Sequence, residues 1–183
     1  MTVQEIKNYA LLLCGQRDIP DAYLLQYINE SMDNLTVKYD SAGQKKILVV
    51  SGIRGEWQDL PSDCVTLKRC NENGSEFIYD NFYVENGQIQ FGNTAEYKIE
   101  YIALQEHVTA LTDTPNINIA YHECLAYGVA FKEATRIFMY EDMVEGNQKF
   151  ILLQEFNKKA IEANNKVSNS KRSRKRIKYA DFF

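Results

Sequence analysis

The residues His122-Glu123-Cys124-Leu125-Ala126 begin like the helix of a zinc protease, which makes them the first place to look for metal chemistry. That chemistry needs a second histidine one helical turn after the first, so that both imidazoles bind the same zinc ion. Position 126 is alanine, so the second ligand is missing. We therefore expect His122 to be a helix residue near a core or an interface, and we expect no metal and no other cofactor.

Two other groups of residues have side chains suited to proton transfer. His107 stands beside Glu106, and a His/Glu pair can act as acid and base. Acidic residues also cluster at positions 141, 142 and 145, and paired carboxylates can hydrolyse glycosides. No Ser or Cys stands at a motif-like position to complete a nucleophilic set. The sequence thus favours a protein that is not an enzyme, with a cell-wall hydrolase using Glu123 or Glu141 as the least favoured alternative.

Composition sets broad limits on the class of protein. The chain has 183 residues, of which 45% are hydrophobic and 25% are charged, as in ordinary globular proteins of one domain with a small insertion. No apolar run approaches the roughly 20 residues of a membrane-spanning helix, so we expect no membrane partner. The four cysteines lack C-x-x-C spacing, which predicts free thiols and synthesis in a reducing cytoplasm.

Charge is distributed unevenly along the chain. Residues 168–183 hold six basic residues and one acidic residue, a net charge of +5, which leaves −9 for the rest of the chain. Such a segment suits contact with nucleic-acid phosphates or with an acidic groove on a protein. Its aromatic residues favour docking, because a docked segment can bury them. The docking residues that we expect are Lys171, Arg172, Arg174, Lys175, Arg176, Lys178, Tyr179, Phe182 and Phe183.

Apolar residues at spacings of three and four predict helices over residues 3–14, about 21–39, about 117–140 and about 147–167. The third segment is apolar nearly all round, which is typical of a helix buried inside a core or between subunits. We interpret it as a subunit interface, with contacts from Tyr121, Leu125, Phe131 and Phe138.

Between residues 45 and 103 the hydrophobic period changes to two, or to short β-branched runs, which predicts four to six strands. Candidate strands lie at 47–50, 64–67, 82–84, 89–91 and 97–101, and Phe77 and Tyr79 also suit a pleated surface. Asn86-Gly87 predicts a hairpin between two of these strands, because both residues tolerate positive φ.

The expected fold is therefore α+β and mainly α. It comprises a bundle of about four helices (residues 1–43 plus 104–167), an inserted small antiparallel β-domain (44–103) and an extended basic C-terminal docking tail (168–183).

Seven short motifs follow one another in a specific order over roughly residues 20–140: Ile28-Asn29-Glu30, Trp57-x-x-Leu60-Pro61-x-Asp63, Asn86-Gly87-Gln88-Ile89, Tyr97-x-Ile99-x-Tyr101, Leu111-Thr112-Asp113, Pro115 through His122, and Ala126-Tyr127-Gly128-Val129-Ala130. In this order and spacing the chain resembles the head-to-tail adaptor proteins (connector, head-completion or tail accessory proteins) of tailed bacteriophages, especially the short-tailed ones.

The resemblance implies a structural virion protein, made in the host cytoplasm and located at the junction of portal and tail. Such proteins are implied to form a dodecameric ring that joins the portal to the tail and helps retain packaged DNA. The implied partners are the portal protein, tail or nozzle proteins, further copies of the chain and the DNA that passes through the ring. In similar proteins a C-terminal extension runs along the portal, and residues 168–183 occupy that place here. The alternative is a nucleic-acid-binding module that acts through the same basic segment, although the acidic body argues against it.

Overall fold

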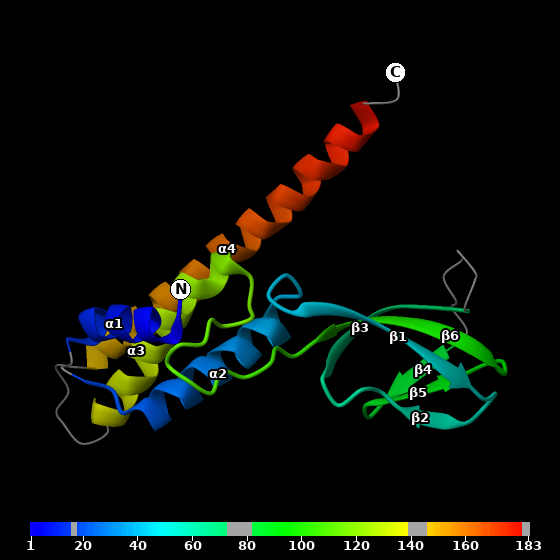
Figure 1. The fold of residues 1–183 in the computed structure, drawn as a ribbon, viewed down its shortest axis with the longest axis horizontal. Helices are drawn as coiled ribbons and strands as arrows, with labels where there is room; N and C mark the ends of the chain where they lie inside the picture. The colour runs from blue at the N-terminus through cyan, green and yellow to red at the C-terminus, as the bar shows by residue number, and fades with distance from the viewer. Residues whose placement is uncertain (16–17, 73–81, 139–145, 181–183) are drawn as a thin grey trace. The chain divides into compact units, whose positions relative to one another are not determined.

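The computed structural model describes residues 1–15, 18–72, 82–138 and 146–180, with the backbone alone for residues 138, 146, 147 and 171–180. The chain divides into two compact units. Met1–Ala42 together with Gln105–Phe183 form the helical unit, and Gly43–Leu104 form the β unit. The described residues hold four α-helices and two small antiparallel sheets (Figure 1), so the predicted α+β class is confirmed.

The first two helices of the helical unit follow local sequence signals. Helix α1 (Val3–Cys14) starts with a capping box, in which Thr2 Oγ1 accepts from the Glu5 N–H and the Glu5 carboxylate accepts from the Thr2 N–H. The helix ends at Gly15, whose φ of 68° is the left-handed conformation that terminates many helices. Helix α2 (Asp21–Lys38) buries an apolar stripe made of Leu24, Ile28, Met32 and Leu35.

Helix α3 (His122–Phe138) lies at the centre of the helical unit and contacts α1, α2 and α4. A 3-10 turn, η1 (Ile119–Tyr121), precedes it, so the first residues of the predicted 117–140 helix are not α-helical. Glu133 on α3 has a fully buried carboxylate, which accepts from Arg136 Nη2 at 2.6 Å. Positions 139 and 140 lie outside the described residues.

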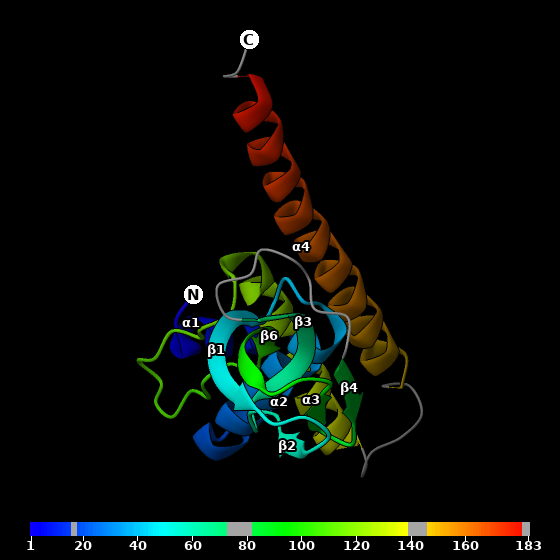
Figure 2. The ribbon, with the colours of Figure 1, turned by 90° about the vertical axis from the view of Figure 1, so that its right-hand side faces the viewer.

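Helix α4 (Gly146–Ala180) is longer than the sequence indicated. The predicted helix stops near 167, with an extended segment after it, whereas the backbone is helical through Ala180. Residues 147–183 contain no glycine or proline, and Arg and Lys are good helix formers, so nothing in the sequence ends the helix at 167. In both views α4 continues past the other helices of its unit (Figures 1 and 2). Within the described residues, no helix combines the length and the apolar content needed to span a bilayer.

The β unit contains two three-stranded antiparallel sheets. One has the order β1 (Gln44–Gly52), β6 (Ala95–Ala103), β3 (Cys64–Glu72), and the other has the order β2 (Trp57–Asp59), β5 (Gln88–Phe91), β4 (Phe82–Glu85). The ring of Phe91 on β5 stacks on that of Tyr97 on β6, with centroids 4.1 Å apart. This contact joins the two sheets in one small core.

The predicted hairpin is confirmed. Strands β4 and β5 pair through a turn in which Asn86 and Gly87 have φ angles of 49° and 77°. Strand β2 was not expected, because three residues are too few for a period to be visible. Phe77 and Tyr79 lie outside the described residues.

Candidate interaction sites

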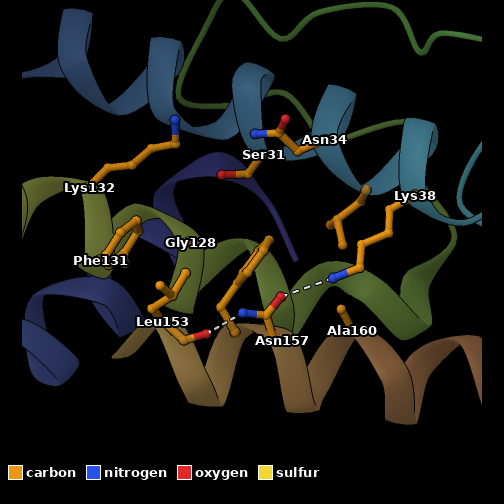
Figure 3. Close-up of a pocket in the computed structure, with 11 residues that line it drawn as sticks. Ser31, Asn34, Lys38, Gly128, Phe131, Lys132, Leu153, Asn157 and Ala160 are labelled. Atoms are coloured by element: carbon orange, nitrogen blue, oxygen red, sulfur yellow. Dashed lines mark hydrogen bonds between the residues drawn. The ribbon is translucent and has the colours of Figure 1, made fainter. Parts of the chain in front are cut away.

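A pocket of about 310 Å³ opens among three helices of the helical unit (Figure 3). We call it the α2–α3–α4 pocket. Its walls mix apolar side chains with amides and two lysines: Ser31, Asn34, Leu35 and Lys38 from α2, Gly128, Phe131 and Lys132 from α3, and Leu153, Phe156, Asn157 and Ala160 from α4.

Gly128, in the middle of a buried helix, lets α2 and α4 approach α3 closely beside this pocket. A Cβ atom at this position would lie 2.7 Å from Ser31 Oγ and 3.1 Å from a ring carbon of Phe156. Glycine inside a helix costs roughly 0.5–1 kcal/mol relative to alanine. The close approach of α2 and α4 to α3 therefore explains a residue that helix propensity disfavours.

The polar groups of the pocket are only partly satisfied. Ser31 is buried, and its Oγ has no hydrogen-bond partner among the described residues. Lys38 Nζ donates to Asn157 Oδ1 at 3.1 Å, but Lys38 makes no ion pair within the described part of the chain. Lys132, at the opposite end of the pocket in Figure 3, is paired with Glu30. The pocket thus offers a cation without a carboxylate and a hydroxyl without a partner.

The second candidate site is the outer face of the small sheet in the β unit, which we call the β2–β5–β4 face. Residues directly opposite one another on neighbouring strands point to the same face. The register therefore makes two rows, Trp57–Gln90–Tyr83 and Asp59–Gln88–Glu85. Each row has a glutamine between two side chains of one kind, aromatic in the first row and acidic in the second.

This face is open to solvent. Tyr83 is 65% exposed and Trp57 is 42% exposed, and both carboxylates are also exposed. Gln88 Nε2 donates to Asp59 Oδ1 at 2.8 Å, whereas Glu85 makes no ion pair within residues 1–15, 18–72, 82–138 and 146–170. Two exposed aromatic rings beside two carboxylates are suited to a partner with an apolar hollow and a cation.

The structure places the predicted interface residues in different environments. Tyr121 and Leu125 are fully buried in the core of their own chain, and the Tyr121 hydroxyl lies 2.5 Å from Ser41 Oγ. Both side chains thus belong to the core of the single chain, and their contact with a second copy stays a prediction. Phe131 is half-buried and lines the α2–α3–α4 pocket. The side chain of Phe138, at the last position of α3, lies outside the described residues.

The basic residues expected to dock lie on the last turns of α4. The backbone of Lys171, Arg172, Arg174, Lys175, Arg176, Lys178 and Tyr179 is helical, while Phe182 and Phe183 lie outside the described residues. Among the α4 side chains that the structure describes, which end at position 170, Val167 is the last one that is buried.

The three polar residues of the stretch that begins like a zinc-protease helix, His122, Glu123 and Cys124, lie in three different environments. His122 Nε2 donates to the Ile117 carbonyl at 3.1 Å, and burial lowers the pKa of this imidazole. Glu123 is paired with Lys159 at 2.8 Å, and burial raises the pKa of the Cys124 thiol to about 12. Within the described residues, no group of three or more His, Cys, Asp or Glu side chains is arranged to hold a metal ion.

Of the other catalytic candidates, the structure describes only His107 and Glu106. His107 and Glu106 line a depression of about 220 Å³, and His107 Nε2 lies 3.1 Å from Asp33, which sequence reasoning did not connect with it. The acidic cluster at 141, 142 and 145 lies outside the described residues.

Sequence reasoning missed both candidate sites. The signal for the pocket was Gly128, a glycine inside a helix that is otherwise apolar. For the sheet face it was the alternation of Tyr83 and Glu85 just before the Asn-Gly turn, which places both side chains on one face.

Comparison with known proteins identifies the family. Residues 1–177, nearly the whole chain, match the family described as SU10 adaptor protein. No curated protein matches the sequence significantly. The family covers both units described above, and it is a family of phage head-to-tail adaptors, as the motif order indicated. The chain therefore belongs to the SU10 adaptor protein family.

Proposed function

We propose that this protein forms a ring at the junction of portal and tail, joins the two, and helps to retain packaged DNA. Its partners in this proposal are the portal protein, tail or nozzle proteins and further copies of the chain. The observation that carries the proposal is the family match over residues 1–177, because a phage head-to-tail adaptor is a structural component of the virion.

A ring needs each copy to present two different surfaces, since a head-to-tail contact closes only when one surface fits the other. The copy number that we propose, twelve, follows from the resemblance to portal-binding adaptors. The chain has two unlike surfaces of suitable chemistry, the α2–α3–α4 pocket and the β2–β5–β4 face.

The basic end of α4 is the proposed attachment to the portal. Residues 168–183 carry a net charge of +5, and four of the six basic residues recur at helical spacing: Lys171, Arg174, Lys175 and Lys178. A helical stretch shorter than about 12–15 residues is marginal in water unless it packs against something. Contact with an acidic groove on the portal would therefore stabilise this end of α4. Tyr179, Phe182 and Phe183 would then supply apolar anchors beside the charges.

Replacement of the six basic residues by glutamine tests this attachment. We expect portal binding at physiological salt to weaken at least tenfold, because each lost charge removes an attraction to the acidic groove. The control is Lys158→Gln with Lys166→Gln, two exposed lysines on the packed part of α4. Equal binding by the six-fold variant and the control would refute the docking role.

The basic segment also supports a second candidate function, binding to nucleic acid. That reading predicts affinity for DNA of any sequence that falls steeply as salt increases. A filter-binding assay at low salt decides the matter, because absence of DNA retention there would remove this candidate.

A further inference from the structure

We propose that the α2–α3–α4 pocket of one copy receives the β4 edge of the β2–β5–β4 face of a second copy, with Tyr83 in the pocket and Glu85 paired with Lys38. The inference rests on the proposed function, because it supplies the contact between neighbours in the ring. It adds to that function a receptor site, an occupant and the residues that join them.

The pocket has the chemistry of a receptor for an aromatic ring next to a carboxylate. Phe131, Leu153 and Phe156 give it apolar walls, and its volume of about 310 Å³ accommodates a large side chain. Lys38 lies at one end and makes no ion pair in the described part of the chain. A bound carboxylate would therefore meet a cation that is not already neutralised.

Ser31 supplies a second polar group inside the pocket. The residue is 1% exposed, and its Oγ is a buried hydroxyl with no partner among the described residues. An unsatisfied buried hydroxyl costs about 1–3 kcal/mol. A ligand with a hydroxyl at the end of an apolar body, as in tyrosine, could satisfy it while the ring contacts the apolar walls.

The β4 edge carries the matching groups. Tyr83 and Glu85 are two residues apart on one strand, so both side chains lie on the same face, about 7 Å apart along the strand. Tyr83 is 65% exposed, the most exposed aromatic residue in the described part of the β unit. Among the described strands β4 is the outer one of its sheet, in the order β2–β5–β4, and the adjoining turn at Asn86 and Gly87 ends it.

Complementary charge and apolar character favour a second copy as the occupant. Within the described residues, the pocket presents a lysine that makes no ion pair, and the β4 edge presents a glutamate that makes none, each beside apolar surface. A tyrosine buried in a pocket at the centre of an interface commonly contributes most of the binding energy, and the adjacent ion pair fixes the register. The contact joins two different surfaces, which is the type that closes into rings.

Charge exchange tests the pairing directly. In full-length protein, we expect Lys38→Glu and Glu85→Lys each to raise the dissociation constant between copies at least tenfold, measured by sedimentation velocity. The double variant should return to within about threefold of the original protein, because the pair is restored in reverse. Lys158→Glu, at an exposed lysine of α4 outside the pocket, is the matched control and should change little. Single variants without effect, or a double variant no better than the singles, would overturn the proposal.

Zero-length cross-linking of carboxylates to amines gives a second readout with the unaltered chain. Concentrated protein, made as an equal mixture of isotopically light and heavy copies, is cross-linked with and without the portal protein. We expect a Lys38–Glu85 link that joins light to heavy peptides. No such link in either sample, or a link only within single copies, would overturn the inference. Links between copies without any portal binding would instead contradict the proposed function alone.

Discussion

His122 is a buried histidine with partners for both ring nitrogens. Its Nε2 donates to the Ile117 carbonyl, and its Nδ1 lies 2.7 Å from the Met1 nitrogen. Burial lowers the pKa of the folded imidazole below its usual value of about 6.5, so the unfolded chain binds more protons as the pH falls. We expect the free energy of unfolding to decrease from pH 7 to pH 5, with a His122 contribution of at most about 1.4 kcal/mol per pH unit.

Urea unfolding at pH 7, 6 and 5 measures this contribution. His122→Gln should have a smaller loss of stability on acidification than the original chain. The control is His107→Gln at the other histidine of the chain, which should keep the His122-dependent part of the slope. An unchanged slope in His122→Gln would show that this imidazole does not couple folding to pH.

At the residue scale, the sequence can argue against a role that needs a missing ligand, but it cannot decide a role that depends on which surface covers a side chain. The absence of a histidine at position 126 was enough to argue against a zinc site around His122. The assignment of Tyr121 and Leu125 to an interface stays a prediction, because an apolar helix has the same pattern whether its own chain or another covers it, and both side chains are already buried within the single chain. Only the positions of α1, α2 and α4 around α3 decide between the two.

Among the structural elements, two glycines of the β unit test different physical constraints. Gly87 needs a positive φ of 77° and has open space around it. A Cβ at Gly52 would lie 2.5 Å from the Phe91 ring and 2.6 Å from the Tyr97 ring. We expect Gly87→Ala to cost about 1–2 kcal/mol through backbone strain, and Gly52→Ala to cost about 1–3 kcal/mol through overpacking.

Asparagine at the same two positions separates these causes. Asparagine tolerates positive φ, so Gly87→Asn should recover most of the stability lost in Gly87→Ala. Gly52→Asn should be worse than Gly52→Ala, because the larger side chain meets the stacked rings. Urea unfolding monitored by near-UV circular dichroism reports both effects, and the same ranking at both glycines would contradict this account.

The elements were predictable where a local signal is strong. Apolar spacing located α1, and the Asn86-Gly87 pair located the β4–β5 hairpin. Strand β2 is too short to show a period, and it exists because β5 pairs with it. After residue 167 the sequence is polar but contains no helix-breaking residue. The prediction relied on an apolar helix face, so it placed the end of α4 too early.

For the whole molecule, the candidate sites were beyond the reach of sequence patterns. The pocket combines Ser31, Gly128 and Asn157 from three helices, and no spacing rule brings those positions together. The sheet face depends on the register of β2 and β4 against β5, which is set by long-range pairing. The order of short motifs carried more functional information, since it indicated the adaptor family that matches residues 1–177.

The central claim is that copies of this chain assemble as a ring on the portal. Electron microscopy of the full-length protein mixed with the portal protein tests it most directly. The account predicts a closed ring of added density at the narrow end of the portal, with adjacent copies joined from helical unit to β unit. Portals without added density, or with scattered single copies that never touch one another, would contradict it.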